Sequence, residues 1–291
     1  MSKEGEKERQ ALLPSPSLAV EAGLVVGTLG VISYLSRVVD RQGLLAGLLV
    51  GYVTYAFGGR FLFLPMVVFH VIAGVSTKYK YDVKREKGVA EEKMGARGWW
   101  NVLANGAVAA AFAFGSGVSG SSVNLVWLAG FLGAIGTAAA DTVATEIGLL
   151  SRKPPRLITD LKTRVPPGTS GGVSVLGESA QIVSSVLTSA AVVIFIPSAD
   201  FARWVFGVTV VSSFVGSTLD SVIGATVQGI FRCEVCQGTT EKRVHCGRKT
   251  VHVRGSPSID NNVVNLLATA FGAAVAIALH LLGVFGFAFR V

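Results

Sequence analysis

The stretch AADTVATEIG, residues 139–148, places Asp141 and Glu146 near the end of an apolar run that begins at about Val123. The run is long enough to cross a bilayer, so it predicts a transmembrane helix. Ionised carboxylates are costly in hydrocarbon, so acids in such helices usually face a polar cavity and serve function. The apolar run from Val205 to Ile230 likewise contains Asp220. Two buried acids on separate spans need a proton or a shared cation. We expect a cation that carries a phosphate group.

The composition is typical of a membrane protein with many spans. Of the 291 residues, 51% are hydrophobic and 15% are charged, and the mean hydropathy is +0.56. These values are too apolar for an ordinary soluble domain. The 35 glycines suit close helix packing in lipid. We therefore predict an all-α fold, a polytopic helical bundle with about eight transmembrane helices, seven being the alternative.

The expected spans follow the apolar runs of the sequence. The second and third runs are short, so they are expected to be tilted, re-entrant or one broken hairpin around Gly58 and Gly59. The eight runs are Leu18–Ser36, Gly43–Phe57, Phe61–Ser76, Asn101–Gly115, Val123–Leu150, Gly171–Ile196, Phe201–Phe231 and Asn261–Phe287.

Residues 1–17 are polar and are expected to form a disordered tail, and residues 18–291 a single transmembrane domain. Three polar loops, at 77–98, 150–168 and 232–259, carry 18 of the 26 Lys and Arg residues. If the spans alternate, all three loops lie on one side, which the positive-inside rule makes cytoplasmic. We expect an integral membrane protein, in the cell membrane of a prokaryote, with its active site facing the cytoplasm.

Polar side chains from five spans should meet in the cytoplasmic half of the bundle. At the helical rise, Asp141 and Asp220 lie roughly 14–17 Å from the cytoplasmic ends of their runs. Two other spans begin on that side with asparagines one turn apart, and another has an acid in a similar position. These residues are Asn101, Asn105, Asn261, Asn265 and Glu178.

Asp141, Glu146 and Asp220 form an oxygen-rich set that suits Mg²⁺, which prefers one or two carboxylates, waters and substrate phosphates. Asp141 and Glu146 are five residues apart and do not share a narrow helix face, so Glu146 can instead turn toward the loop. A proton or sodium relay of a transporter is the alternative.

A glycine-rich loop leads into the sixth apolar run, and successive N–H groups at a helix start bind anions. Its candidate phosphate-binding residues are Gly168, Thr169, Ser170, Gly171, Gly172 and Ser174. Lys162 and Arg164 lie just upstream and favour phosphate, whereas a hinge or packing role is equally open. Cations also stabilise a transferred phosphoryl group, and the 77–98 loop offers four. These are Lys84, Lys87, Lys93 and Arg97, of which Lys93 and Arg97 are the catalytic candidates.

All three cysteines lie in the third polar loop, as Cys233, Cys236 and Cys246, and His245 adjoins the last. On the cytoplasmic side a disulfide is not expected. The four side chains have the composition of a structural zinc site, although the usual second CxxC is missing. Reduced thiols in a mobile loop are the alternative.

Four motifs, at residues 95–106, 140–146, 168–174 and 219–228, together resemble a known membrane family. It contains the plant phytyl phosphate kinase of vitamin E synthesis and uncharacterised animal and prokaryotic homologues. The resemblance implies transfer of a nucleotide γ-phosphate, with CTP the expected donor, onto an isoprenyl monophosphate to give the diphosphate. It does not settle the catalytic residues.

Two other function classes stay open. A cytidylyltransferase would form a CDP-lipid from CTP and a lipid phosphate with the same metal and phosphate apparatus. An ion-coupled transporter or flippase of lipid phosphates would use Asp141 and Asp220 as ion sites near the midplane. Nucleic-acid binding is not indicated, because the basic loops lack a known module. The expected partners are a nucleoside triphosphate, an isoprenyl monophosphate and membrane lipid, and a homodimer stays open.

Overall fold

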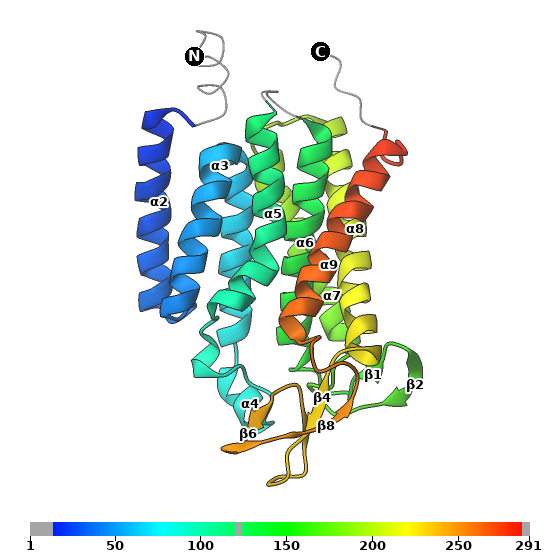
Figure 1. Ribbon diagram of the computed structural model, residues 1–291. Helices are drawn as coiled ribbons and strands as arrows, with labels where there is room; N and C mark the ends of the chain where they lie inside the picture. Colours follow the sequence, from blue (N-terminus) through cyan, green and yellow to red (C-terminus); the bar gives the residue numbers. More distant parts are fainter. Residues whose placement is uncertain (1–13, 120–123, 287–291) are drawn as a thin grey trace.

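The computed structural model describes residues 14–119 and 124–286 as a helical bundle with a layer of short strands at one end (Figure 1). Within these ranges, seven helices are long and apolar enough to cross a membrane. They are α2 (Pro16–Leu35), α3 (Arg41–Lys78), α5 (Trp99–Val118), α6 (Leu125–Gly148), α7 (Val175–Val193), α8 (Ala199–Thr226) and α9 (Asn261–Leu281). The predicted all-α membrane bundle is confirmed.

Helix α3 is two arms that double back on each other. Gly59 breaks the helix with φ 61° and ψ −166°, a conformation open to glycine. A straight helix of 38 residues would separate its ends by about 57 Å. Instead, a Cβ placed on Gly74 would meet Val38 at 3.2 Å, and the Tyr55 and Phe63 rings contact each other across the break. The predicted broken hairpin is therefore present, with the two arms of α3 side by side (Figure 1).

Helix α6 is the centre of the bundle. Every residue from Leu128 to Ala140 is buried, and the helix packs against α3, α5, α7, α8 and α9. Small residues allow these close contacts: a Cβ on Gly133 would lie 2.3 Å from the Gly272 carbonyl oxygen of α9. Asp141 directly follows this buried segment, so the fold holds it among neighbouring helices.

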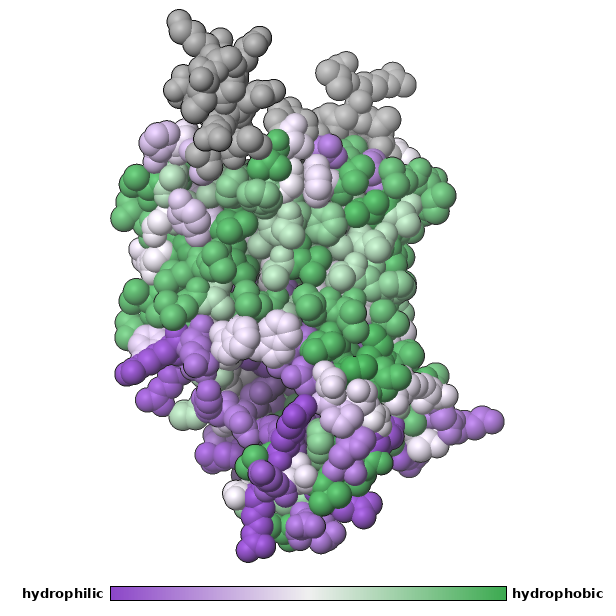
Figure 2. All heavy atoms as spheres, in the orientation of Figure 1, coloured by the Kyte–Doolittle hydropathy of each residue, from purple (hydrophilic) through white to green (hydrophobic). Residues whose placement is uncertain are grey.

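All the shorter elements lie at the end of the bundle opposite the start of α2 (Figure 1). Figure 2 shows a hydrophobic band around the helices and hydrophilic side chains gathered at this end. The elements are α4 (Tyr81–Glu86), η1 (Lys93–Gly95), β1 (Arg156–Leu157), β2 (Asp160–Arg164), β3 (Gly172–Val173), β4 (Ile230–Arg232), β5 (Thr239–Thr240), β6 (Val244–His245), β7 (Arg248–Lys249) and β8 (Val251–Arg254). The strands form the antiparallel sheets β2-β1-β3 and β5-β4-β8 and the pair β6-β7.

Several helix ends differ from the expected spans. Residues 1–13 of the expected tail lie outside the described ranges, and α2 begins at Pro16. Helix α7 begins at Val175 because the glycine-rich segment before it is extended, and α8 ends at Thr226 before strand β4. Asp141 and Asp220 are therefore seven and six residues from their helix ends, or about 10 Å. The expected depth of 14–17 Å was too large.

Candidate metal and phosphate site

A polar cavity of about 130 Å³ lies where α6, α7 and α8 meet the strand layer. Its lining includes Asp141, Glu178, Asp220 and Asn261 from the helices, together with the whole segment from Pro167 to Ser174. The structure thus brings together the two intramembrane acids and the glycine-rich loop, which are far apart in the sequence. The cavity forms only when these separate elements pack together.

Asp141 and Asp220 both line this cavity, and their carboxyl groups lie near enough to influence each other electrostatically. Asn265 extends this pair: in the amide orientation that satisfies both of its ends, its nitrogen donates to Asp220 Oδ2 at 3.1 Å, and its oxygen accepts from Asn105 Nδ2 at 3.1 Å. Two carboxylates this close repel each other unless they share a proton or a cation. The polar residues Asn105, Asn265, Asp220 and Asp141 are therefore arranged to bind a proton or a cation.

The glycine-rich loop reaches the helices through a glycine-specific contact. Gly171 has φ +76°, and a Cβ there would lie 2.5 Å from the Ala225 Cβ and 2.6 Å from the Ser221 carbonyl oxygen. Only glycine lets the loop approach α8 this closely beside Asp220. Ser174 then caps α7, its Oγ accepting from the Gly177 N–H at 3.1 Å. The loop therefore lines the same cavity as the acids.

Glu241 also lines the cavity, although it comes from the β5–β6 loop of the strand layer. It accepts a hydrogen bond from the Ser170 hydroxyl. Burial raises the pKa of the Glu241 carboxyl above its usual value, and the charge of Glu91 adds to this. The sequence analysis did not single out Glu241, because its loop lies beyond the end of the transmembrane helix. The one signal available was its position between the Cys233–Cys236 pair and the His245–Cys246 pair.

The cavity is acidic. Its lining holds the carboxyls of Asp141, Glu178, Asp220 and Glu241, and among the described residues no Lys or Arg contributes to it. Thr145 and Ser221 add hydroxyl groups. Hard oxygen donors without a neighbouring base are the ligands that Mg²⁺ prefers, so these residues fit a magnesium ion. The same composition does not suit a bare phosphate, which would need a cation with it.

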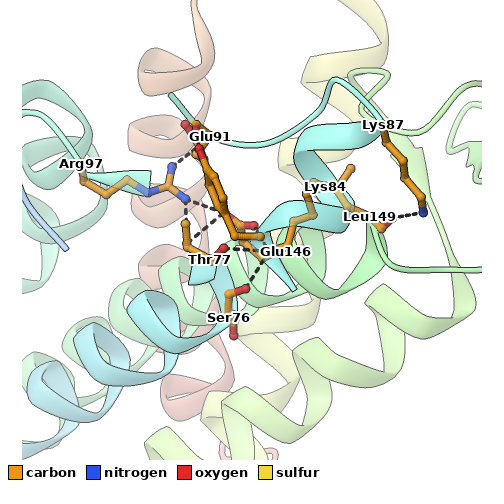
Figure 3. Close-up of polar contacts among 9 residues, drawn as sticks. Ser76, Thr77, Lys84, Lys87, Glu91, Arg97, Glu146 and Leu149 are labelled. Carbon is orange, nitrogen blue, oxygen red and sulfur yellow. Dashed lines mark hydrogen bonds and ion pairs between the residues drawn. The ribbon is translucent and has the colours of Figure 1, made fainter. Parts of the chain in front are cut away.

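Glu146 does not join this set. Its Oε2 lies 2.6 Å from Lys84 Nζ, and its Oε1 lies 2.9 Å from Arg97 Nη2 and accepts from Thr77 Oγ1 at 2.9 Å (Figure 3). Both oxygens are thus occupied, because the side chain turns toward the 77–98 loop. The structure thus places Glu146 and Lys84 outside the acidic cavity, in a cluster that joins the loop to the bundle. This arrangement gives no support to the predicted roles of Glu146 as a metal ligand and of Lys84 as a phosphate ligand.

The other basic candidates lie outside the cavity. Lys87 donates to the Leu149 carbonyl oxygen at 2.8 Å (Figure 3), and Lys93 pairs with Asp40 at 2.7 Å. Lys162 and Arg164 are exposed on β2. The sheet places Arg164 opposite Arg156, and Arg156 opposite Val173 of the cavity wall, so these bases stand about 10 Å from the wall. Of the predicted basic residues, only Lys162 and Arg164 belong to the same sheet as the glycine-rich loop.

A second, apolar cavity of about 680 Å³ runs between α2, α3 and α5. Residues such as Leu44, Gly47 and Val67 line it. At its polar end it reaches Arg97, Asn101, Asn105 and Thr142. Asn105 belongs to the hydrogen-bond chain to Asp220, and Thr142 adjoins Asp141. The apolar cavity and the acidic cavity therefore lie on two sides of the same carboxyl pair.

The four zinc candidates, Cys233, Cys236, His245 and Cys246, also meet, with all ligand atoms within 4.8 Å of one another. They lie in the strand layer, apart from the carboxyl pair. Most of the predicted site residues are thus divided among the acidic cavity, the apolar cavity, the Glu146 cluster and this cysteine cluster, while Lys87, Lys93, Lys162 and Arg164 lie outside all four.

A comparison with protein families matches residues 24–273 to the family described as "Integral membrane protein DUF92". The chain belongs to this family. The expected resemblance is thereby confirmed. Among the curated relatives of this DUF92 chain are three proteins at 29% identity. "Protein PGR" of Arabidopsis thaliana aligns with 84% of the chain and 91% of its own length. "Protein VTE6, chloroplastic" of the same plant aligns with 95% and 75%.

The third is "Uncharacterized membrane protein sll0875" of Synechocystis, with 79% of the chain and 78% of its own length aligned. No solved structure matches the chain. The family match covers every residue that lines the two cavities.

Proposed function

We propose that this protein is a magnesium-dependent kinase that transfers the γ-phosphoryl group of a nucleoside triphosphate, with CTP the favoured donor, to an isoprenyl monophosphate. The observation that carries the proposal is the pairing of Asp141 and Asp220 in one cavity, whose lining includes the glycine-rich loop, near an apolar cavity that reaches Asn105 and Thr142. Kinship with VTE6, and the motifs shared with the family of the plant phytyl phosphate kinase, support the same reaction.

Asp141 and Asp220 would hold Mg²⁺, with Asn265 orienting the Asp220 carboxylate. When bound, the ion would neutralise the negative charge on the donor phosphates that develops during transfer. The acceptor is already an anionic phosphate oxygen, so no side chain has to remove a proton from it. In the transfer, this oxygen bonds to the γ-phosphorus as the bond to the leaving nucleoside diphosphate breaks.

The glycine-rich loop supports a positioning role. Thr169, Ser170 and Gly171 line the cavity, and backbone N–H groups in such loops bind phosphate oxygens. A space of about 130 Å³ has room for phosphates and an ion but not for a whole nucleotide. The nucleoside would then lie outside it, toward the exposed bases Lys162 and Arg164.

The apolar cavity supports a lipid acceptor. Its lining is mostly hydrophobic and its polar end reaches Asn105 and Thr142. An isoprenyl chain between α2, α3 and α5 would place its phosphate at this polar end, beside the carboxyl pair. The basic end of the bundle would face the cytoplasm under the positive-inside rule, where nucleotides are available.

The test is turnover of the purified, detergent-solubilised protein with Mg²⁺, phytyl or geranylgeranyl monophosphate, and each of CTP, ATP, GTP and UTP. Mass spectrometry of both products is expected to find the isoprenyl diphosphate and an equal amount of nucleoside diphosphate. A CDP-lipid with pyrophosphate would establish the cytidylyltransferase instead. The absence of turnover with every donor would overturn both enzymes and leave the transporter.

Asp141→Asn and Asp220→Asn should each lower kcat by at least about 100-fold, because metal-held charge neutralisation is the main contribution to phosphoryl transfer. Asp200→Asn is the matched control, since Asp200 is exposed and pairs with Arg203 at the other end of the bundle. Near-normal turnover of Asp141→Asn would exclude the proposed metal role.

A further inference from the structure

The cysteine cluster has almost the dimensions of a zinc coordination shell. His245 Nδ1 lies 3.5 Å from Cys236 Sγ and 3.3 Å from Cys246 Sγ, and all four ligand atoms, including Cys233 Sγ, lie within 4.8 Å of one another. In a tetrahedral site, Zn–S and Zn–N bonds place neighbouring ligand atoms about 3.4–3.8 Å apart. The observed spacings therefore need only a small contraction around an ion.

Two hairpin turns present the four ligands in pairs. Cys233 and Cys236 lie in the turn between β4 and β5, where the Cys233 N–H donates to the Gly238 carbonyl oxygen at 2.9 Å. His245 and Cys246 lie at the turn between β6 and β7, where Cys246 has φ 50°. The Cys233 sulfur also lies 3.6 Å from the His245 carbonyl oxygen, so the two turns contact each other at the cluster.

The segment has almost no hydrophobic core of its own. Among residues 232–260, all of which the structure describes, Cys233 is the one buried side chain. Small units of this kind usually need a metal or disulfides to stay folded. A disulfide would use two sulfurs and leave the third beside an imidazole without a role. A metal ion uses all four side chains.

We propose that Cys233, Cys236, His245 and Cys246 bind one structural Zn²⁺ ion, and that this ion fixes the loop that carries Glu241 to the acidic cavity. Four protein ligands fill a tetrahedral shell, so the ion has no open position for a substrate. Its role is structural. It stabilises the strand layer above the membrane.

The link to the cavity follows from the chain itself. Glu241 lies between the two ligand pairs, five residues after Cys236 and four before His245. It accepts from Ser170 of the glycine-rich loop, while its neighbour Lys242 pairs with Glu92 at 2.7 Å. With both turns held on one ion, the loop between them has little freedom, so its contacts to the two other loops are kept.

The test is the metal content of the full-length protein purified in detergent under reducing conditions without added chelator. Elemental mass spectrometry is expected to find about one zinc per chain. After exchange for Co²⁺, the spectrum should show thiolate-to-cobalt charge transfer and the strong visible bands of a tetrahedral ion. A zinc-free protein that gives no such spectrum with Co²⁺ would overturn the proposal, as would fewer than three free thiols in the unreduced, denatured chain.

The exposed ligands provide variants that should still fold. Cys236→Ser and Cys246→Ser are expected to lose zinc affinity by more than about 100-fold, because even loss of an outer hydrogen-bond partner costs about 10–100-fold. His252→Asn is the matched control, since His252 lies on β8 against the Phe231 ring and outside the cluster. Full zinc content in both cysteine variants would overturn the assignment of these ligands.

Hydrogen exchange separates the effect on the loop from the effect on binding. In the zinc-free Cys246→Ser protein, amides of residues 227–260 and of the contacting 168–174 loop should exchange at least about tenfold faster, while those of α6 stay protected. Unchanged exchange in both loops would exclude the link between the ion and Glu241. None of these measurements depends on the kinase proposal.

Discussion

Lys84 Nζ lies 2.6 Å from Glu146 Oε2, with side chains that are 0% and 3% exposed. The two residues are 62 positions apart, and their contact fastens the loop after α3 to the end of α6. Arg97 binds the other oxygen of Glu146 and also Glu91, so one buried acid gathers three segments (Figure 3).

Lys84→Met should destabilise the protein by about 3 kcal/mol, because it leaves the buried carboxylate with only one cation. Thermal unfolding in detergent checks this against Lys87→Met, whose lysine is exposed and binds one carbonyl oxygen. The double variant Lys84→Met/Glu146→Met should recover most of the loss, since an apolar pair of similar volume often replaces a buried ion pair at little cost. Equal melting temperatures for Lys84→Met and Lys87→Met would contradict this role.

The sequence could predict which functional residues each span carries, but little about which residues of different spans lie in contact. Asp141 and Asp220 were found because acids in apolar runs are costly, and the α3 hairpin because two glycines interrupt a run that is too short for two full spans. That the two acids lie near each other was inferred from their similar depths in the two spans. The helix ends confirm similar depths but make both smaller than expected. One sequence carries no record of which helices touch.

The roles of Glu146 and Glu241 show the limit most clearly. Glu146 shares a helix with Asp141, but five residues place the two side chains about 140° apart around the axis. The spacing therefore left open that Glu146 turns toward the 77–98 loop, as it does, but could not name its partners Lys84 and Arg97. Glu241 lies in a charged loop segment, yet the strand layer carries it to the cavity. The partners of both acids depend on long-range packing, which residue type and spacing do not encode.

Gly171→Ala should impair catalysis without unfolding the bundle. The added Cβ would strike α8 beside Asp220 and would also strain a φ of +76°, so the loop must shift away from the cavity. A displacement of about 1 Å at a site of this kind can cost roughly 100-fold in rate. The measurement is kcat with a fixed donor. Gly23→Ala is the control, because a Cβ on Gly23 meets nothing within 4 Å and Gly23 lines neither cavity. Similar kcat values for the two variants would show that the loop position does not matter.

Asn265→Ala should weaken magnesium dependence rather than abolish turnover. Asp220 loses its amide donor, and an outer partner of a metal ligand typically contributes 10–100-fold to affinity. The Mg²⁺ concentration for half-maximal activity is therefore expected to rise by about that factor, with kcat at saturating Mg²⁺ largely kept. Asn262→Ala, one position after Asn261 and in neither cavity lining, should leave it unchanged. An unaltered Mg²⁺ titration for Asn265→Ala would remove Asn265 from the metal site.

Glu241 should make the stability of the magnesium-free protein fall as pH rises. Burial raises its pKa in the folded protein above the ordinary 4.5, so the fold favours the protonated form. Its contribution is therefore fully present below about pH 4.5 and is lost as pH rises through the raised pKa.

Glu241→Gln should have a higher melting temperature than the parent protein at neutral pH, and the difference should shrink toward pH 5. Glu234→Gln, an exposed acid of the same loop, should show no such trend. A constant difference across this pH range would count against a buried, titrating Glu241.

Filling the apolar cavity should act on the acceptor lipid alone. Gly47 lines this cavity, and space is open where its Cβ would stand, so Gly47→Phe places a ring in the proposed path of the isoprenyl chain. We expect the KM for geranylgeranyl monophosphate to rise about tenfold or more, with a smaller rise for a five-carbon acceptor and no change in the KM for the nucleotide. Gly23→Phe is the matched control, since Gly23 also has open space around it but lies outside both cavities. If Gly47→Phe raises the KM for short and long acceptors equally, the chain does not lie between α2, α3 and α5. If it raises the KM for the nucleotide instead, this cavity binds the donor, and the assignment of the two cavities must be exchanged.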